Sequence, residues 1–197
     1  MAHEDEEKDR ARHHEQEELL RARLRDAVVQ DDAEIAALAL EIELSNEDLP
    51  IAIAYRAEFD GVRRLTIQVD LPPLDDIPLT RSRVTKTGKF SERPMAMRDR
   101  VVLYQDVCAG LALRLMHEVY RVLPFMECVD LTGVAEGVSP ATGHAERYPA
   151  LHLSTTREQF VAINLDEVDS SQALQGLGGH LATTREGTLK PVDPEHG

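Results

Sequence analysis

The spacing of apolar residues changes repeatedly along this chain, and the order of those changes restricts the folds it can adopt. A helical spacing in residues 19–44 gives way to alternation in 51–71, a second helical spacing covers 99–123, and β-rich runs fill 127–165. A helix buries one face every 3.6 residues and a strand one face every 2, so this order predicts an α+β fold. We expect an N-terminal acidic amphipathic helix, then a small mixed or antiparallel sheet packed by one long central helix.

The alternating region Ile51–Leu71 predicts a β-hairpin. Its two runs meet at Asp60-Gly61, and glycine adopts the positive φ of a tight hairpin turn without steric cost. Pro72-Pro73 ends the second run, because proline has no N–H to donate to a β-ladder.

The central helix is predicted over Asp99–Leu123, where one apolar stripe ends at Pro124. The stripe consists of Leu103, Val107, Leu111, Leu115, Val119 and Val122.

The remainder of the chain is predicted to be β-rich. We expect strands over Met126–Val134 and Ala150–Thr155, joined by the turn Ser139–Gly143, and a helical turn that opens at Thr156. The glycine-rich stretch 176–179 and the Pro/Asp/Glu/Gly tail are typical of an exposed end or linker. The predicted organisation is a charged helical segment 1–45, an α+β domain 46–192 and a tail 193–197.

The N-terminal segment is dense in charge and lacks Gly and Pro between residues 3 and 35. Its apolar residues follow a helical spacing, which predicts an amphipathic helix. They are Leu19, Leu20, Leu24, Val28, Ile35, Leu38 and Ile42. Leu20, Leu24 and Val28 are the residues we expect to dock a partner.

Composition limits the functional classes. The net charge of −14 repels nucleic acid and anionic membranes unless the cations are segregated. Cys108 and Cys128 form no CxxC pair, so we expect structural thiols rather than zinc or redox ligands. The N-terminus lacks the signal-peptide pattern and no apolar run approaches ~18 residues, so we expect a cytoplasmic protein with no membrane partner.

One segment does concentrate positive charge. Residues 79–100 carry seven cations against two carboxylates, a local charge of +5. Arg81, Arg83, Lys86 and Lys89 are the predicted phosphate contacts, since screening confines each charge's reach to about 8–10 Å. The alternative is a solvated loop, or one paired with the acidic N-terminal helix. Phe90 is its only aromatic residue, which disfavours recognition of single strands by stacking.

Motifs for catalysis and cofactor binding are incomplete in this sequence. Gly88-Lys89 lacks the other glycine and the hydroxyl residue of a phosphate loop, and the 176–181 stretch lacks the third glycine of a dinucleotide fingerprint. His117-Glu118 would need a second histidine where Arg121 stands, so we expect a packed or salt-linked pair. We predict no catalytic residue, metal or cofactor, and expect that the chain is not an enzyme.

Seven strings of this sequence together resemble one known arrangement. They are Val69–Pro78, Leu103-Tyr104, Ala112–Tyr120, Ser139–Gly143, Ser154–Phe160, Asn164–Asp169 and Leu189–Val192. In order and spacing they are similar to the region that precedes the catalytic domain of bacterial Mrr-like restriction endonucleases. Ser170 departs from that pattern, which usually has proline there. The family's nuclease carries an Asp-Gly-Gly-Val-Asp-type loop and a Gln-Ala-Lys-Arg-type strand, neither of which occurs in these 197 residues.

The resemblance implies a non-catalytic accessory module of a restriction or phage-defence nuclease system. Such a module would serve assembly or DNA engagement, with double-stranded DNA and a nuclease subunit or a second copy as its expected partners. The alternative is a structural oligomerisation domain that acts through its N-terminal helix and never contacts nucleic acid. Salt-dependent DNA binding distinguishes the two hypotheses.

Overall fold

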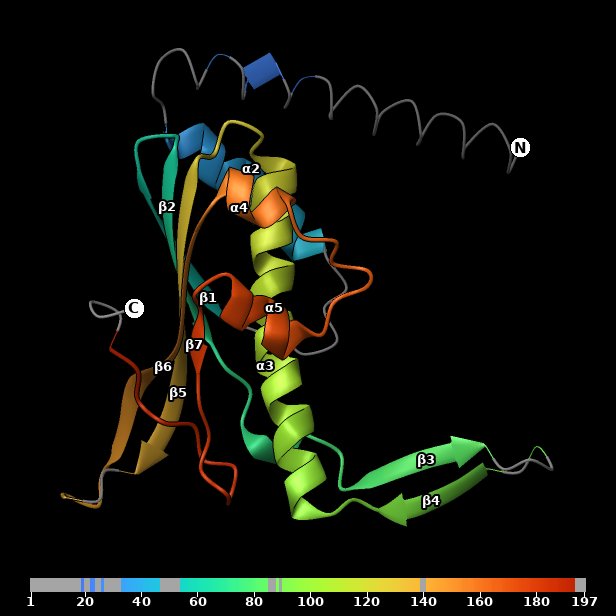
Figure 1. The fold of residues 1–197 in the computed structure, drawn as a ribbon. Coiled ribbons are helices and arrows are strands. Elements are labelled where there is room, and N and C mark those ends of the chain that lie inside the picture. The colour runs from blue at the N-terminus through green and yellow to red at the C-terminus, as the bar shows by residue number, and fades with distance from the viewer. Residues whose placement is uncertain are drawn as a thin grey trace, which may run out of the picture.

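The computed structural model describes residues 33–46, 54–84, 88, 90–138 and 141–193, together with residues 19, 22, 23 and 26. It has the predicted α+β architecture, in which a mixed sheet is packed by a long central helix and a separate hairpin extends from the body (Figure 1). The helices are α2 (Ala33–Asn46), η1 (Leu74–Asp76), α3 (Met97–Val122), α4 (Arg157–Val161) and α5 (Ser170–Gly176). The strands are β1 (Tyr55–Asp60), β2 (Arg64–Asp70), β3 (Thr80–Val84), β4 (Phe90–Pro94), β5 (Cys128–Val138), β6 (Ala145–Thr156) and β7 (His180–Leu181).

The larger sheet has five strands in the order β1-β2-β5-β6-β7. β1 and β2 form the predicted hairpin, and its turn contains Gly61 with a φ of 63°. β2 runs parallel to β5, whereas the other neighbouring pairs are antiparallel. A parallel pair needs a long crossover, and here the crossover contains the β3–β4 hairpin and α3.

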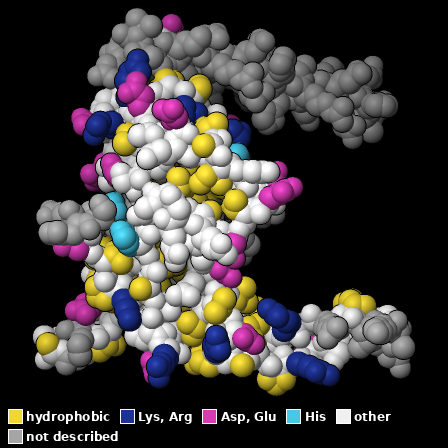
Figure 2. All heavy atoms as spheres, in the orientation of Figure 1, with side chains coloured by type: hydrophobic (Ala, Val, Ile, Leu, Met, Phe, Trp, Pro, Cys, Tyr) yellow, Lys and Arg dark blue, Asp and Glu magenta, His cyan; other side chains and the backbone are white. Residues whose placement is uncertain are grey.

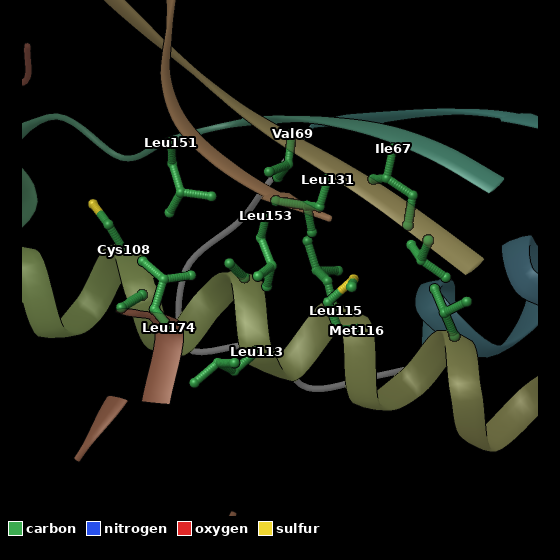
Figure 3. Close-up of a cluster of buried hydrophobic side chains, with 14 of the residues drawn as sticks. Ile67, Val69, Cys108, Leu113, Leu115, Met116, Leu131, Leu151, Leu153 and Leu174 are labelled. Carbon is green, nitrogen blue, oxygen red and sulfur yellow. The ribbon is translucent and has the colours of Figure 1, made fainter. Parts of the chain in front are cut away.

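One face of this sheet is buried and the other is polar. Along β2, Leu65, Ile67 and Val69 are buried while the residues between them are exposed or half-buried. Figure 3 shows Ile67 and Val69, with Leu131 of β5, directed toward Leu115 and Met116 of α3. This alternation is typical of a sheet with helices on one face and solvent on the other.

α3 begins at Met97, two residues before the predicted start, and ends at Val122, before Pro124. Its most deeply buried side chains differ from the predicted stripe, because Leu103, Val107 and Leu111 are only half-buried. The helix contacts both the sheet and α5, which widens the buried arc beyond one stripe. The buried residues are Arg100, Val101, Tyr104, Cys108, Ala109, Ala112, Leu113, Leu115, Met116, Glu118, Val119 and Tyr120.

The predicted apolar stripe of the N-terminal helix is wrong where the structure describes it. In α2 the buried side chains are Ala36, Ala39, Leu40 and Leu44. Leu38 and Ile42, which the periodicity assigned to the packed stripe, are 48% and 42% exposed. The spacing of the larger apolar residues misses Ala36 and Ala39, whose small side chains let this helix approach its neighbours closely.

Residues 170–189 are part of the fold. Asp169 accepts a hydrogen bond from the Gln172 N–H at the start of α5, and Leu174 of that helix is buried. β7 then adds to β6, and Leu189 further along the chain is also buried. The prediction of an exposed end or linker at 176–179 is wrong, because the two-turn helix and the two-residue strand that flank this stretch are too short to show a hydrophobic period.

The predicted helical turn at Thr156 is confirmed. Thr156 accepts a hydrogen bond from the Gln159 N–H, and the Gln159 side chain accepts one from the Thr156 N–H, which is a capping box. None of the helices within the described residues is long and apolar enough to cross a membrane.

Candidate nucleic-acid interface

The β3–β4 hairpin, which we call the arm (residues 79–95), is a sheet separate from the other five strands. It leaves the molecule near the N-terminal end of α3 and extends away from the body (Figure 1). The loop or edge strand predicted here is therefore a two-stranded ribbon. A ribbon of two strands packs little surface of its own and is only marginally stable in isolation.

The strand register gives the arm two different faces. Arg81 lies directly opposite Arg93, and three residues further along β3 Val84 lies directly opposite Phe90. Successive side chains on a strand point to opposite faces, so the two pairs lie on opposite faces of the ribbon. One face carries the arginine pair near the root of the arm, and the other carries Glu92 and, near the outer end, the apolar pair.

The arginine pair is unfavourable unless an anion is present. Like charges directly opposite each other on neighbouring strands destabilise a sheet. Arg81 and Arg93 are both exposed, and within the described residues neither forms an ion pair. A polyanion bound to this face would remove the repulsion.

The predicted phosphate contacts are only partly described. Arg81 is exposed on β3, as expected for a contact residue. Arg83 pairs with Ser91 through the strand register, and its side chain lies outside what is described. Lys86 and Lys89 lie outside the described residues. Figure 2 shows Lys and Arg side chains along the described part of the arm.

Arg93 was not among the residues predicted for this site. It belongs to the same basic segment, but its position opposite Arg81 depends on a five-residue connection between β3 and β4. The signal in the sequence was Gly88, whose φ of 77° helps the chain to reverse direction. Sequence spacing alone leaves several registers open.

The root of the arm is held by a buried arginine. Arg100 lies in the first turn of α3, and the residue is 8% exposed. Its Nε donates to the Ile77 carbonyl at 3.2 Å and its Nη2 donates to the Leu74 carbonyl at 2.7 Å. Both carbonyls precede β3, and the Met95 N–H donates to the Leu79 carbonyl at 2.8 Å where β4 ends. Arg100 therefore fixes the segment that leads into β3 to the first turn of α3, and the Met95–Leu79 bond closes the base of the ribbon.

α2 does not neutralise the arm. Glu43 of α2 pairs with Arg121 at 3.0 Å, near the C-terminal end of α3, whereas the arm leaves from the N-terminal end. α3 has 26 residues, and a helix of that length spans about 39 Å. That separation is several times the Debye length of about 8 Å at physiological ionic strength. The carboxylates of α2 therefore do not cancel the positive potential around the arm.

The other candidate groups have structural explanations. Glu118 is buried and pairs with Arg121 at 2.7 Å and with Arg114 at 3.2 Å, as predicted for a salt-linked residue, while His117 is exposed. Burial raises the pKa of the Cys108 thiol to about 12, so this group stays protonated and unreactive. Cys128 is half-buried. Among the described residues no group of three or more His, Cys, Asp or Glu could hold a metal ion.

The predicted docking residues Leu20, Leu24 and Val28 lie outside the described residues. Beside them in sequence Leu19 is described and exposed, and the exposed side of α2 carries two further apolar residues, Leu38 and Ile42. Leu38 and Ile42 are four residues apart, so they share one face of the helix.

Comparisons with known proteins identify no relative of this chain. No family model, no curated protein and no solved structure matches the chain.

Proposed function

We propose that this chain is a non-catalytic, DNA-engaging accessory module of a restriction or phage-defence nuclease system in the cytoplasm, and that the arm is its contact with duplex DNA. The observation that carries the DNA contact is the exposed Arg81–Arg93 pair on a ribbon that extends from an acidic protein. The nuclease context comes from the resemblance of residues 50–192 to the region that precedes the Mrr-like catalytic domain.

The dimensions of the arm suit a duplex. The major groove of B-DNA is about 12 Å wide and admits a two-stranded β-ribbon. Neighbouring strands lie about 4.8 Å apart, so the ribbon is narrower than this groove, and the exposed side chains of Arg81 and Arg93 are long enough to contact phosphates at its edges. Phosphate contacts of this type supply affinity and position without reading sequence.

The charge of the whole protein does not prevent this contact. A net charge of −14 repels DNA at long range, but salt screens that repulsion beyond about 8 Å. The arm extends its cations away from the acidic body (Figure 1). We therefore expect binding that is weak, without sequence preference and strongly salt-dependent.

The test is fluorescence anisotropy of a labelled duplex titrated with the protein at several salt concentrations. Each phosphate contact contributes about 0.9 to the slope of log affinity against log salt. Replacing Arg81→Ala and Arg93→Ala together is expected to weaken binding at every salt concentration and to reduce the slope by about 2. Replacing Arg81, Arg83, Lys86 and Lys89 by alanine should abolish detectable binding.

The matched control is Arg56→Ala with Arg64→Ala. These two arginines are exposed on β1 and β2, so the double variant changes the net charge equally but on the body. It should bind like the wild type apart from a small effect of net charge. Equal loss in both double variants, or unchanged binding in the arm variant, would contradict a DNA contact through the arm.

Assembly through α2 is the second candidate function, and the exposed Leu38 and Ile42 favour it. Because Leu40 and Leu44 of the same helix are buried, deleting residues 1–45 would damage the core. Leu38→Glu with Ile42→Glu is the better test, because it changes only the exposed side. A fall in mass from oligomer to monomer by light scattering would support assembly through this face, and a monomeric wild type would exclude it.

A further inference from the structure

β1 forms one edge of the five-stranded sheet. It pairs with β2 on one side, and no strand of the described residues pairs with it on the other. α2 contacts both β1 and α3, so it packs under the sheet rather than along the outer edge of β1 (Figure 1). A strand at the edge of a sheet presents unpaired backbone N–H and C=O groups, to which a further strand can add.

The pairing of β1 with β2 identifies which backbone groups point outward. The Asp70 N–H donates to the Ala54 carbonyl at 2.9 Å, and these two residues continue the register of the hairpin by one step. In an antiparallel pair, alternate residues direct both their N–H and their C=O toward the same neighbouring strand. The backbone groups of Tyr55, Ala57 and Phe59 therefore point away from β2, toward the open edge.

The side chains of β1 alternate between apolar and charged. The three apolar residues are half-buried and contact the core, whereas Arg56 and Glu58 are exposed on the opposite face. The residues opposite Arg56 and Glu58 on β2 are uncharged, and within the described part of the chain neither forms an ion pair. Charged side chains on an edge usually discourage pairing, but two opposite charges two residues apart make a strand complementary to its own antiparallel copy.

We propose that two copies of this chain pair through β1, antiparallel and about a two-fold axis at Ala57, so that their sheets become continuous. Arg56 then lies opposite the partner's Glu58, and Tyr55 lies opposite the partner's Phe59. Because the axis is two-fold, each of these contacts occurs twice. The three outward residues form hydrogen-bonded pairs, and the charged residues occupy the positions between them, where opposed side chains lie closest.

The charges of β1 disfavour the neighbouring registers. The outward backbone groups of the two copies stay matched only if the register shifts by two residues at a time. A shift in one direction places Arg56 opposite the same residue of the second copy. A shift in the other direction pairs Arg56 with Asp60 but places Glu58 opposite itself, and a further shift places Glu58 opposite Asp60. Like charges directly opposite each other destabilise a sheet, so of these registers the one centred on Ala57 is favoured.

The test is the mass of the full-length protein by light scattering at submillimolar concentration, without DNA. The wild type is expected at twice the mass of one chain. Arg56→Glu and Glu58→Arg should each weaken dimerisation by about tenfold or more, because both interchain ion pairs become like-charge contacts. Both residues are exposed, so neither change disturbs the core, and unchanged urea unfolding of the variants verifies this.

Two combinations of these substitutions restore complementarity. In an equal mixture of the two single variants, one copy carries two acidic residues at these positions and the other carries two basic residues, so a heterodimer should form. The double variant Arg56→Glu with Glu58→Arg exchanges the two charges within one chain and should dimerise like the wild type. The matched control is Arg98→Glu, which makes the same change of net charge at an exposed position on α3 and should leave the dimer intact.

A dimer that both single variants lose and the mixture regains supports pairing through β1. A monomeric wild type, a dimer that both single variants retain, or a mixture that stays monomeric overturns it. Loss of the dimer in Leu38→Glu with Ile42→Glu but not in Glu58→Arg also overturns it and assigns assembly to α2.

The dimer and the DNA contact fail separately, because each protomer keeps its own arm and the masses are measured without DNA. A monomeric protein that binds DNA leaves the proposed function intact, and a dimer that binds no DNA leaves the pairing through β1 intact. For the same reason the Arg56→Ala, Arg64→Ala control of the DNA titration retains the phosphate contacts of the arm.

Discussion

The five-stranded sheet and the arm are both built from β-strands, yet the apolar side chains of the sheet are buried and those of the arm are exposed. In the larger sheet, Leu131 and Leu153 are fully buried against the helices. In the arm, Val84 and Phe90 lie on a ribbon that extends from the body and are mostly exposed. The sheet's hydrophobic residues therefore maintain the fold, whereas those of the arm are free to contact a partner.

The largest expected difference concerns truncation of a core side chain. Leu131→Ala should lower the free energy of unfolding by about 2–5 kcal/mol, because it removes buried methyl groups and leaves a cavity. Urea unfolding followed by circular dichroism measures this loss. A loss well below 1 kcal/mol would show that the sheet is not the stabilising core.

The next effect concerns the junction between the two regions. Arg100→Ala should cost about 1.5–3 kcal/mol, because a charged donor to the Leu74 and Ile77 carbonyls is lost. The matched control is Arg98→Ala, an exposed arginine in the same helical turn. Equal melting temperatures for the two variants would show that Arg100 does not anchor the arm.

A smaller effect is the pH dependence of stability that a histidine of the larger sheet contributes. Burial lowers the pKa of His152 below 6.5, opposed by Asp130 and reinforced by His180. The unfolded chain then binds a proton more readily than the folded one. The stability due to neutral His152 is therefore complete above pH 6.5 and is lost as the pH falls from 6.5 through the folded pKa.

His152→Gln should accordingly flatten the fall in melting temperature below pH 6.5. His144→Gln, which changes an exposed histidine, should leave the profile as in the wild type. A wild-type profile that rises as the pH falls through this range would contradict the direction of the shift.

The smallest expected effect is on the arm itself. Val84→Ala should change the free energy of unfolding by no more than about 0.5 kcal/mol, since the side chain is 57% exposed. The same urea titration used for Leu131→Ala measures it. A loss comparable to that of the core variant would show that the arm packs against something that stabilises the fold.

The regular elements could be predicted from the sequence because their signals are local. The Asp60-Gly61 hairpin and α3 each show a clear period with a turn or proline at the end. α5 and β7 could not be predicted, because they owe their place to contacts with distant elements rather than to their own pattern.

The candidate site was predicted in composition but not in geometry. The concentration of positive charge in 79–100 singles out the segment that forms the exposed arm, including Arg81. The pairing of Arg81 with Arg93 depends on strand register, and the anchoring role of Arg100 depends on the carbonyls that η1 presents to it. Neither contact can be recognised from the local sequence.

The most direct measurement is hydrogen–deuterium exchange of the full-length protein with and without duplex DNA at low salt. In the free protein, amides of β5 and β6 should exchange slowly. Those of the arm should exchange quickly, because the backbone hydrogen bonds of an isolated two-stranded ribbon break readily in solvent. With DNA, we expect new protection confined to residues 79–95. Protection on α2 or the larger sheet instead, or no change on the arm under conditions where DNA is bound, would contradict the account.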